Sequence, residues 1–537
     1  MRNKIGNIYL FLIFGIFPLV FHDYYFDIFR VKYYFFVCIT IVTFMILMFT
    51  NNIDKNKILR VFREKGMLCY IAFLFLALCS TVISKNHYAA LTGNAGRNNG
   101  LLIYIVFSLG YIVLIQADRL YWEMFAVLEI SGALVGSLAI LNHYGVDPIG
   151  FMTEIGWNDD FMSTIGNVSS VVEYMVIVLA VSGMFFIIEE NRKKSMFHGA
   201  VFTVSILSIL LAGPDAAYGG LIFFYLFSVF AIKTAREKIH YIILIILLLI
   251  AFSGIGILNE QNYHFVVYQK NLSMITRALC KQRGKIYLLL LSLVIAGMVI
   301  YFFSKHSMKV WDRIPLKKIY AVVMVGAFVI MAGTFIAVNT GRIEVDPWTV
   351  LGKMKINDTW GTNRGYIWRT AWQYYKQLPV TKKILGIGPD TMYYVYEEMG
   401  TFNDGIAIDN AHFIPLQLLV THGAAGLITW IGWIVGALYL CIKKADKSKR
   451  YYLIFIGIVT YYATAVFGIN LISSSAVATL MIGLCFCQFS EENMSQVQKK
   501  KWVGNIVILV VFLVLLLGFK VVCQADETVM LNKLWME

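Results

Sequence analysis

The sequence predicts an all-α polytopic membrane protein with about 12–15 transmembrane helices and one large, structured extracytoplasmic loop. Hydrophobic residues make up 59% of the 537 residues and charged residues only 15%, whereas soluble domains average about 45–50% and about 25%. Polar segments divide the chain into apolar stretches of about 20 residues, the length that spans a bilayer as a helix. Basic residues also concentrate in every second loop, as in membrane proteins of defined orientation.

Each candidate span is an apolar stretch bounded by polar residues. The first stretch has no small-residue cleavage site, so we interpret it as a retained span and not as a signal peptide. The stretch 412–441 is long enough to be bent or tilted, and the division around residues 467–471 is the least distinct. The candidate spans begin near Ile8, Tyr33, Met67, Leu101, Met124, Val168, Phe197, Tyr218, Ile239, Ile286, Ile319, His412, Tyr451, Leu471 and Trp502.

The formal net charge of +14 is compatible at first with binding of nucleic acid or of acidic lipid. If the N-terminus is cytoplasmic and the spans alternate, the basic clusters fall on the cytoplasmic side, as the positive-inside rule requires. The charge therefore marks topology and contact with anionic membrane lipids, and we expect no nucleic-acid partner. The expected location is the cytoplasmic (inner) membrane, crossed many times. The basic clusters lie at residues 55–63, 192–194, 236–238, 305–318, 443–450 and 499–501.

This orientation places the longest polar segment outside the cell and divides one integrated domain into three parts. Residues 1–338 form an N-terminal transmembrane bundle, residues 339–410 an extracytoplasmic loop with an amphipathic helix, and residues 411–537 the C-terminal transmembrane helices. The loop is rich in Trp, Tyr, Gly and Arg. Long loops within compact folds are usually functional.

Within the loop, Asn363 is a possible helix cap. Aromatic residues recur on one helical face at Trp368, Trp372 and Tyr375, together with Ala371. A helix lying on the outer leaflet, with its aromatic side chains as interface anchors, explains this face equally well. An arginine on the outer side is explained less well by topology.

Three external arginines suggest anion recognition. Arg364 and Arg369 lie in the predicted amphipathic helix, and Arg97 lies between Gly96 and Gly100, just before a span. The guanidinium group presents a rigid fork of donors that matches phosphate oxygens and stays charged. Arginines at the membrane surface could thus hold the diphosphate head group of a lipid.

Several motifs in order along the chain carry a resemblance to a known family. The segment Arg364-Gly365-Tyr366-Ile367-Trp368 is followed by Pro379 and Gly386-Ile387-Gly388, and then by His412 with Gly423-Ala424-Ala425-Gly426. Together they resemble the outer loop of the O-antigen ligase and polymerase superfamily. The segment Ser163-Thr164-Ile165-Gly166-Asn167 is similar to that family's small-residue motif.

Two positions depart from the family pattern. Ligases of the family usually carry an amide or hydroxyl residue after the histidine, whereas this chain has Phe413 there and Asn410 before it. The family often has a Ser/Thr-Arg pair near the next outer turn, where this chain has Gly213-Pro214-Asp215. The missing amide weakens the strict ligase interpretation and favours a polymerase by a small margin.

The resemblance implies a GT-C-like fold and a membrane glycosyltransferase that uses an undecaprenyl-diphosphate-linked oligosaccharide and an acceptor glycan, lipid or protein. It implies catalytic roles for His412, as the base, and for Arg364, which would stabilise the departing diphosphate. Substrate binding is assigned to Arg97, Arg364, Arg369, Asn410 and Trp368. The outer loops contain no Asp-x-Asp motif, so we expect a metal-independent reaction without a cofactor.

Other residues have two interpretations of similar weight. Glu173 lies inside a span, where ionisable groups are usually functional, but close enough to the interface to reach water; Asp215 is similar. Gly423 and Gly426 fit close helix packing better than direct substrate contact, and His422 fits a structural role.

Two other classes of protein remain open. A lipid-linked oligosaccharide flippase or other polysaccharide transporter would more often show inverted repeats and mid-membrane charges, and neither is evident in the sequence. A structural or sensor protein would not need the ordered arginine-to-histidine motifs. The sugar, the linkage and the acceptor are not specified by the sequence.

Overall fold

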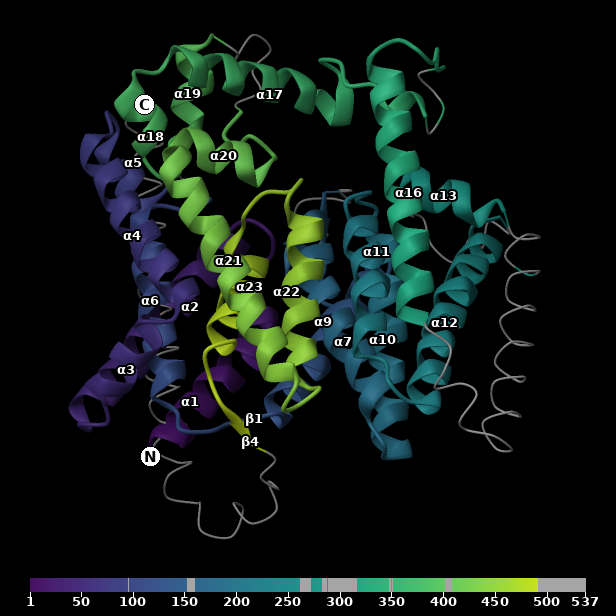
Figure 1. Ribbon diagram of the computed structural model, residues 1–537, viewed down its shortest axis with the longest axis horizontal. Coiled ribbons are helices and arrows are strands. Elements are labelled where there is room, and N and C mark those ends of the chain that lie inside the picture. The colour runs from purple at the N-terminus through teal and green to yellow at the C-terminus, as the bar shows by residue number, and fades with distance from the viewer. Residues whose placement is uncertain are drawn as a thin grey trace.

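The computed structural model describes residues 1–94, 96–151, 160–260, 272–282, 287, 316–346, 349, 351–400 and 408–490. In these ranges the protein is almost entirely helical, and the helices stand side by side as a bundle (Figure 1). The predicted spans near Ile286 and Trp502 lie outside the described residues. The predicted all-α membrane class is confirmed.

Seven helices in the described ranges are long and apolar enough to cross a membrane. They are α2 (Ile28–Phe49), α4 (Lys65–Ile83), α7 (Glu123–His143), α9 (Val168–Ile188), α10 (Arg192–Ala212), α12 (Ala235–Glu260) and α21 (Gly423–Ala445). Other helices with apolar segments stand beside them at the predicted positions. These are α6 (Leu101–Gln116), α11 (Ala217–Ser228) with η3 (Val229–Ala231), α16 (Leu316–Asn339), α22 (Tyr451–Ala465) and α23 (Ile472–Leu484).

The predicted first span is one helical segment that changes pitch. It runs through α1 (Arg2–Phe11), the π-helical η1 (Leu12–Ile16) and the 3₁₀-helical η2 (Phe17–Leu19). Short helices lie outside the spans: α3 (Lys55–Phe62), α5 (His87–Thr92) and α13 (Met274–Cys280). Two minimal sheets tie loops together: β1 (Leu120–Tyr121) pairs in parallel with β4 (Phe489–Ser490), and β2 (Phe161–Met162) pairs antiparallel with β3 (Gly166–Asn167).

Helix α9 forms the centre of the bundle. In its most apolar stretch 94% of the residues are buried. The reason is that its neighbours in the bundle pack around it, namely α7, α10, α11, α12, α22 and α23. A helix that is apolar on every side belongs either in a packed interior or among lipid, and α9 is covered by protein. Residues at its first turns therefore reach the outer surface only through gaps between the neighbouring helices.

The outer helices expose apolar side chains in a way that fits a lipid environment. Val322, Val329 and Ile330 on α16 are more than half exposed, as are Phe75 on α4 and Ile428 on α21. A soluble monomer rarely exposes such an extensive apolar surface. The bundle thus has a packed interior and an apolar outer surface.

Two buried ionisable groups of the bundle, His198 and Lys32, have partners on neighbouring segments. The ring of His198 on α10 lies 2.7 Å from the Glu129 carboxylate on α7, and Lys32 on α2 donates to the carbonyl oxygens of Phe17 and Pro18 at 3.1 and 3.0 Å. Because an unpaired charge is costly inside a membrane, these contacts hold particular helices together.

At one end of the bundle, the helices of the outer loop segment gather outside the spans (Figure 1). Helix α17 (Trp360–Gln377) lies across the bundle, and α18 (Val380–Leu385), α19 (Met392–Glu398) and α20 (Ile414–Thr421) pack near it; the one-turn η4 (Gly352–Met354) precedes them. The long predicted stretch 412–441 is therefore two helices, α20 and α21, which meet at His422.

Candidate functional site

Helix α17 places the arginines of the outer loop, and its first turn is irregular. Thr359 is its N-cap residue, so the predicted cap at Asn363 is wrong; Asn363 lies inside the first turn with a φ of 65°. A Cβ atom on Gly365 would lie nearer than 3.0 Å to the backbone of Asn357. Glycine after Arg364 therefore lets the preceding loop cross α17 closely.

The buried face of α17 differs in part from the predicted aromatic face. Ile367 and Ala371 are buried in a small core, while Trp372 is 44% exposed. Trp372 instead stacks on Tyr375 at a distance of 5.6 Å between the ring centres. The Lys376 ammonium group lies over the Trp372 ring, 5.7 Å from the ring centre. Aliphatic residues, and not Trp372, attach α17 to the neighbouring helices α19 and α20.

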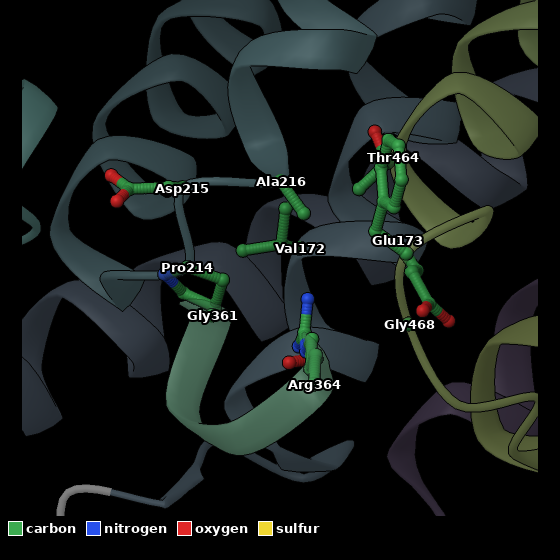
Figure 2. Close-up of a pocket in the computed structure, with 11 residues that line it drawn as sticks. Val172, Glu173, Pro214, Asp215, Ala216, Gly361, Arg364, Thr464 and Gly468 are labelled. Carbon is green, nitrogen blue, oxygen red and sulfur yellow. The ribbon is translucent and has the colours of Figure 1, made fainter. Parts of the chain in front are cut away.

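Arg364 extends from α17 toward α9 and lines a pocket of ≈ 210 Å³ (Figure 2). It has no hydrogen bond or ion pair to any residue that the structure describes, and burial lowers the pKa of its guanidinium group. A half-buried cation without a counter-ion is costly. The arrangement leaves all five guanidinium donors available to an anion.

The other two predicted arginines are already paired. Arg97 forms a two-pronged ion pair with Asp409, with N–O distances of 2.8 and 2.9 Å. Arg369 forms the same kind of pair with Asp358, at 3.0 and 2.5 Å, and about half of its side chain is exposed. Arg364 thus differs from both in having no carboxylate partner among the described residues.

His412 lies in the turn that leads into α20, in a left-handed conformation with a φ of 50°. Its backbone N–H donates to the Asn410 side-chain oxygen at 2.7 Å. The pKa of the imidazole is lowered to about 4, first by burial and then by the charges of Arg364 and Arg97, while Asp409 opposes the shift. Both arginines therefore lie close enough to His412 for their charge to act on it.

Trp368 fixes the turn that carries His412. Its indole N–H donates to the Ala411 carbonyl oxygen at 2.9 Å, and its ring lies 5.1 Å from the ring of Phe413. Phe413 in turn stacks on Phe467 at 5.6 Å. The position that carries an amide in the ligases is occupied here by an aromatic packing residue.

Residues 272–431 match the family model described as O-antigen ligase. The match confirms the resemblance to the O-antigen ligase and polymerase superfamily over the segment that holds Arg364, Trp368, Arg369, Asn410 and His412. No curated protein matches the chain.

The glycine motifs of the O-antigen ligase segment are explained by close backbone packing. The N–H groups of Ile387 and Gly388 donate to the carbonyl oxygens of Val420 and Thr421, at 3.2 and 3.0 Å. Gly423 has a φ of 71°, and a Cβ atom on it would lie nearer than 3.0 Å to the backbone of Ile384. These glycines thus join the α18–α19 turn to the break between α20 and α21.

Two acidic residues that hold the Arg97 loop were missed from the sequence. Asp390 is buried and accepts the backbone N–H groups of Asn94 and Asn99 at 2.8 and 3.0 Å, and Asp409 pairs with Arg97. Burial raises the pKa of the Asp390 carboxyl to about 7. The two segments are about 300 residues apart in sequence, and no local pattern reports such a contact.

Proposed function

We propose that this protein is a membrane glycosyltransferase that transfers or polymerises an oligosaccharide carried on undecaprenyl diphosphate at the outer face of the cytoplasmic membrane. A function of the O-antigen ligase or polymerase type is supported by the family match. The observation that carries the finer proposal is Arg364, a half-buried cation that lines a pocket and has no partner among the described residues.

Arg364 is the proposed contact of the donor's diphosphate. A guanidinium group binds phosphate oxygens with two parallel hydrogen bonds, and negative charge grows on the diphosphate as its bond to the sugar breaks. A preorganised cation in a site shielded from water stabilises that charge without rearrangement. The chain's own arginine would therefore suffice as the charge-stabilising group.

The other predicted residues take supporting roles in this proposal. Arg97 adds positive potential beside His412, although Asp409 neutralises part of it. Arg369 lies further out on α17 and meets the head group only if Asp358 releases it. Trp368 and Asn410 hold the turn in the conformation that presents His412.

His412 is the proposed base that takes the proton from the acceptor hydroxyl. In the free protein burial and the charges of the two arginines disfavour its protonated form. A bound diphosphate would cancel that positive charge, so donor binding would raise the pKa of His412 toward the range in which a base is effective. Binding of the donor and activation of the base would thereby be coupled.

The sidedness of the site is inferred from charge. The basic segment 443–450 includes the last residues of α21 and the loop after it, at the end of the bundle opposite α17, and short basic loops stay in the cytoplasm. The end with α17, Arg364 and His412 then faces outward, and the N-terminus is cytoplasmic.

The choice between polymerase and ligase rests on the acceptor. Phe413 packs between Trp368 and Phe467 and offers no polar group where ligases carry an amide, which favours a polymerase. Purified protein incubated with lipid-linked oligosaccharide, extracted from cells that lack the protein, should release undecaprenyl diphosphate and yield a ladder of repeat units. A single transfer to another lipid or a protein would indicate a ligase; release of no undecaprenyl diphosphate would contradict the proposal and favour a flippase.

A further inference from the structure

The pocket that contains Arg364 has a second wall, formed by the membrane bundle itself. Its lining comes from the first turns of α9, the turn between α10 and α11, and the end of α22, with α17 closing it (Figure 2). At ≈ 210 Å³ it is smaller than the roughly 300–1,000 Å³ of sites for drug-sized ligands. It matches a compact group such as one sugar residue.

Glu173 is the ionisable residue that α9 contributes to this inner wall. It is 1% exposed, and its Oε2 atom accepts the Ser474 hydroxyl proton at 2.6 Å. Its Oε1 atom is buried without a hydrogen-bond partner among the described residues. A buried oxygen left unpaired is unfavourable, and ionisable groups retained inside a membrane bundle usually act on a ligand.

Gly468 keeps the space beside this oxygen free. Gly468 lines the same pocket, and a Cβ atom on it would lie nearer than 3.0 Å to Glu173 Oε1. Any other residue would push against the carboxyl group or displace the loop between α22 and α23. The absence of a side chain therefore preserves an approach to the unpaired oxygen.

The lining residues on the remaining side carry no second cation. The turn at Pro214 and Asp215 replaces the arginine that the family often has there, and Figure 2 shows the Asp215 side chain pointing away from Arg364. The pocket thus offers the guanidinium group of Arg364 and, at Glu173, a buried carboxyl oxygen without a partner among the described residues. A ligand that fits both has a phosphate group and a hydroxyl group side by side.

We propose that the Glu173 pocket is the acceptor subsite, in which Glu173 Oε1 accepts a hydrogen bond from a hydroxyl group of the acceptor sugar. This inference rests on the proposed function, since it places the acceptor beside the diphosphate held by Arg364. Glu173 binds and orients the sugar, and the proton of the attacking hydroxyl still passes to His412. The carboxyl group then determines which hydroxyl pattern is accepted.

The test compares two substitutions of Glu173, one that removes the accepting oxygen and one that keeps it. Glu173→Leu removes the oxygen in a side chain of similar size. Glu173→Gln retains Oε1, because Ser474 can accept from the new amide and donate instead to the Leu471 carbonyl oxygen, 3.3 Å away. The matched control is Ser170→Ala on the same helix, whose buried hydroxyl is also unpaired but does not line the pocket.

Two ligands are measured separately on purified full-length protein. One is undecaprenyl diphosphate; the other is the free oligosaccharide released by mild acid from lipid-linked material of a deletion strain, added to protein saturated with undecaprenyl diphosphate. We expect Glu173→Leu to weaken oligosaccharide binding about 10- to 100-fold, and Glu173→Gln to weaken it much less. All three variants should bind undecaprenyl diphosphate as the native protein does.

Unchanged oligosaccharide binding by Glu173→Leu overturns the acceptor subsite, as does failure of the native protein to bind the oligosaccharide. Equal losses in Glu173→Leu and Ser170→Ala, or loss of undecaprenyl diphosphate binding by Glu173→Leu, overturn it as well, because the effect is then one of packing. Failure of the native protein to bind undecaprenyl diphosphate is a different result, and it contradicts the proposed function itself.

Discussion

At the scale of single residues, the pairing of charges distinguishes three arginines that look alike in the sequence. Arg97 and Arg369 are each held by a carboxylate, whereas Arg364 faces a pocket without one among the described residues. The sequence predicted all three as anion contacts from residue type and sidedness. It could not separate them, because their partners Asp409 and Asp358 come from folding of the loops.

The contribution of Arg97 to donor binding has to be measured together with its partner Asp409, because the two side chains form an ion pair. Arg97→Ala leaves the Asp409 carboxylate unpaired beside the proposed diphosphate site, so we expect donor affinity to fall by about tenfold or more. Arg97→Ala combined with Asp409→Asn removes both charges and should recover most of that loss. Titration of undecaprenyl diphosphate against the purified variants measures this, and a double variant as weak as the single one would contradict it.

The pH dependence of transfer reports on His412. Its pKa is lowered to about 4, so the imidazole in the free enzyme is neutral across the neutral range. We expect kcat/KM to stay constant between about pH 6 and 8 and to fall only as the pH approaches about 4, while the acid limb of kcat lies at higher pH because bound diphosphate cancels the arginine charges. His412→Gln should remove the limb together with most of the rate. An acid limb of kcat/KM near the ordinary histidine pKa of 6.5 would contradict this account.

The same shift affects stability with a defined sign. His412 is protonated near pH 6.5 in the unfolded chain and only near pH 4 in the folded protein. The free energy of unfolding therefore decreases as the pH falls from 6.5 to about 4, and His412 has no such effect above pH 6.5.

At the scale of elements, the break between α20 and α21 joins the outer helices to the bundle. The spacing of His412, Gly423 and Gly426 was evident in the sequence, and a packing role for the glycines was the favoured interpretation. Gly423 supports that role, since the backbone of Ile384 leaves no room for a side chain. The length of the stretch 412–441 suggested a bent or tilted segment, but the position of the break at His422 was not predicted, because the apolar pattern continues through it.

Gly423→Ala tests this junction. The substitution adds a Cβ atom against backbone at a positive φ, so we expect a loss of about 1–3 kcal/mol in stability and reduced transfer. Gly254→Ala on α12 is the matched control, because a Cβ atom there meets nothing within 4 Å. Thermal unfolding of both variants in detergent checks the prediction, and equal unfolding temperatures would show that the junction tolerates a side chain.

At the scale of the whole molecule, the spans were the most predictable feature. In the described residues each predicted span has a helix at its place. This agreement is expected because the bilayer sets both the length and the apolar composition of spanning segments. The arrangement of those helices was not predictable. The central position of α9, and with it the placement of Glu173 beneath Arg364, depends on helices that are distant in sequence.

The orientation of the bundle in the membrane can be measured directly. Thr381 on α18 and Lys447 after α21 are both exposed and lie at opposite ends of the bundle. We expect an impermeant maleimide to label Thr381→Cys in intact cells and to label Lys447→Cys only after permeabilisation, as basic loops remain inside. The unsubstituted protein gives the background from its native cysteines, and the reverse pattern would place the site in the cytoplasm.

The claim that Arg364 holds the lipid diphosphate is tested most directly by the affinity of purified protein for undecaprenyl diphosphate. A charge-assisted hydrogen bond contributes about 1.5–3 kcal/mol, so Arg364→Ala should bind about 10- to 100-fold more weakly. Arg342→Ala, which removes an exposed arginine after α16, should bind like the native protein. Equal affinity of Arg364→Ala and the native protein would contradict the account.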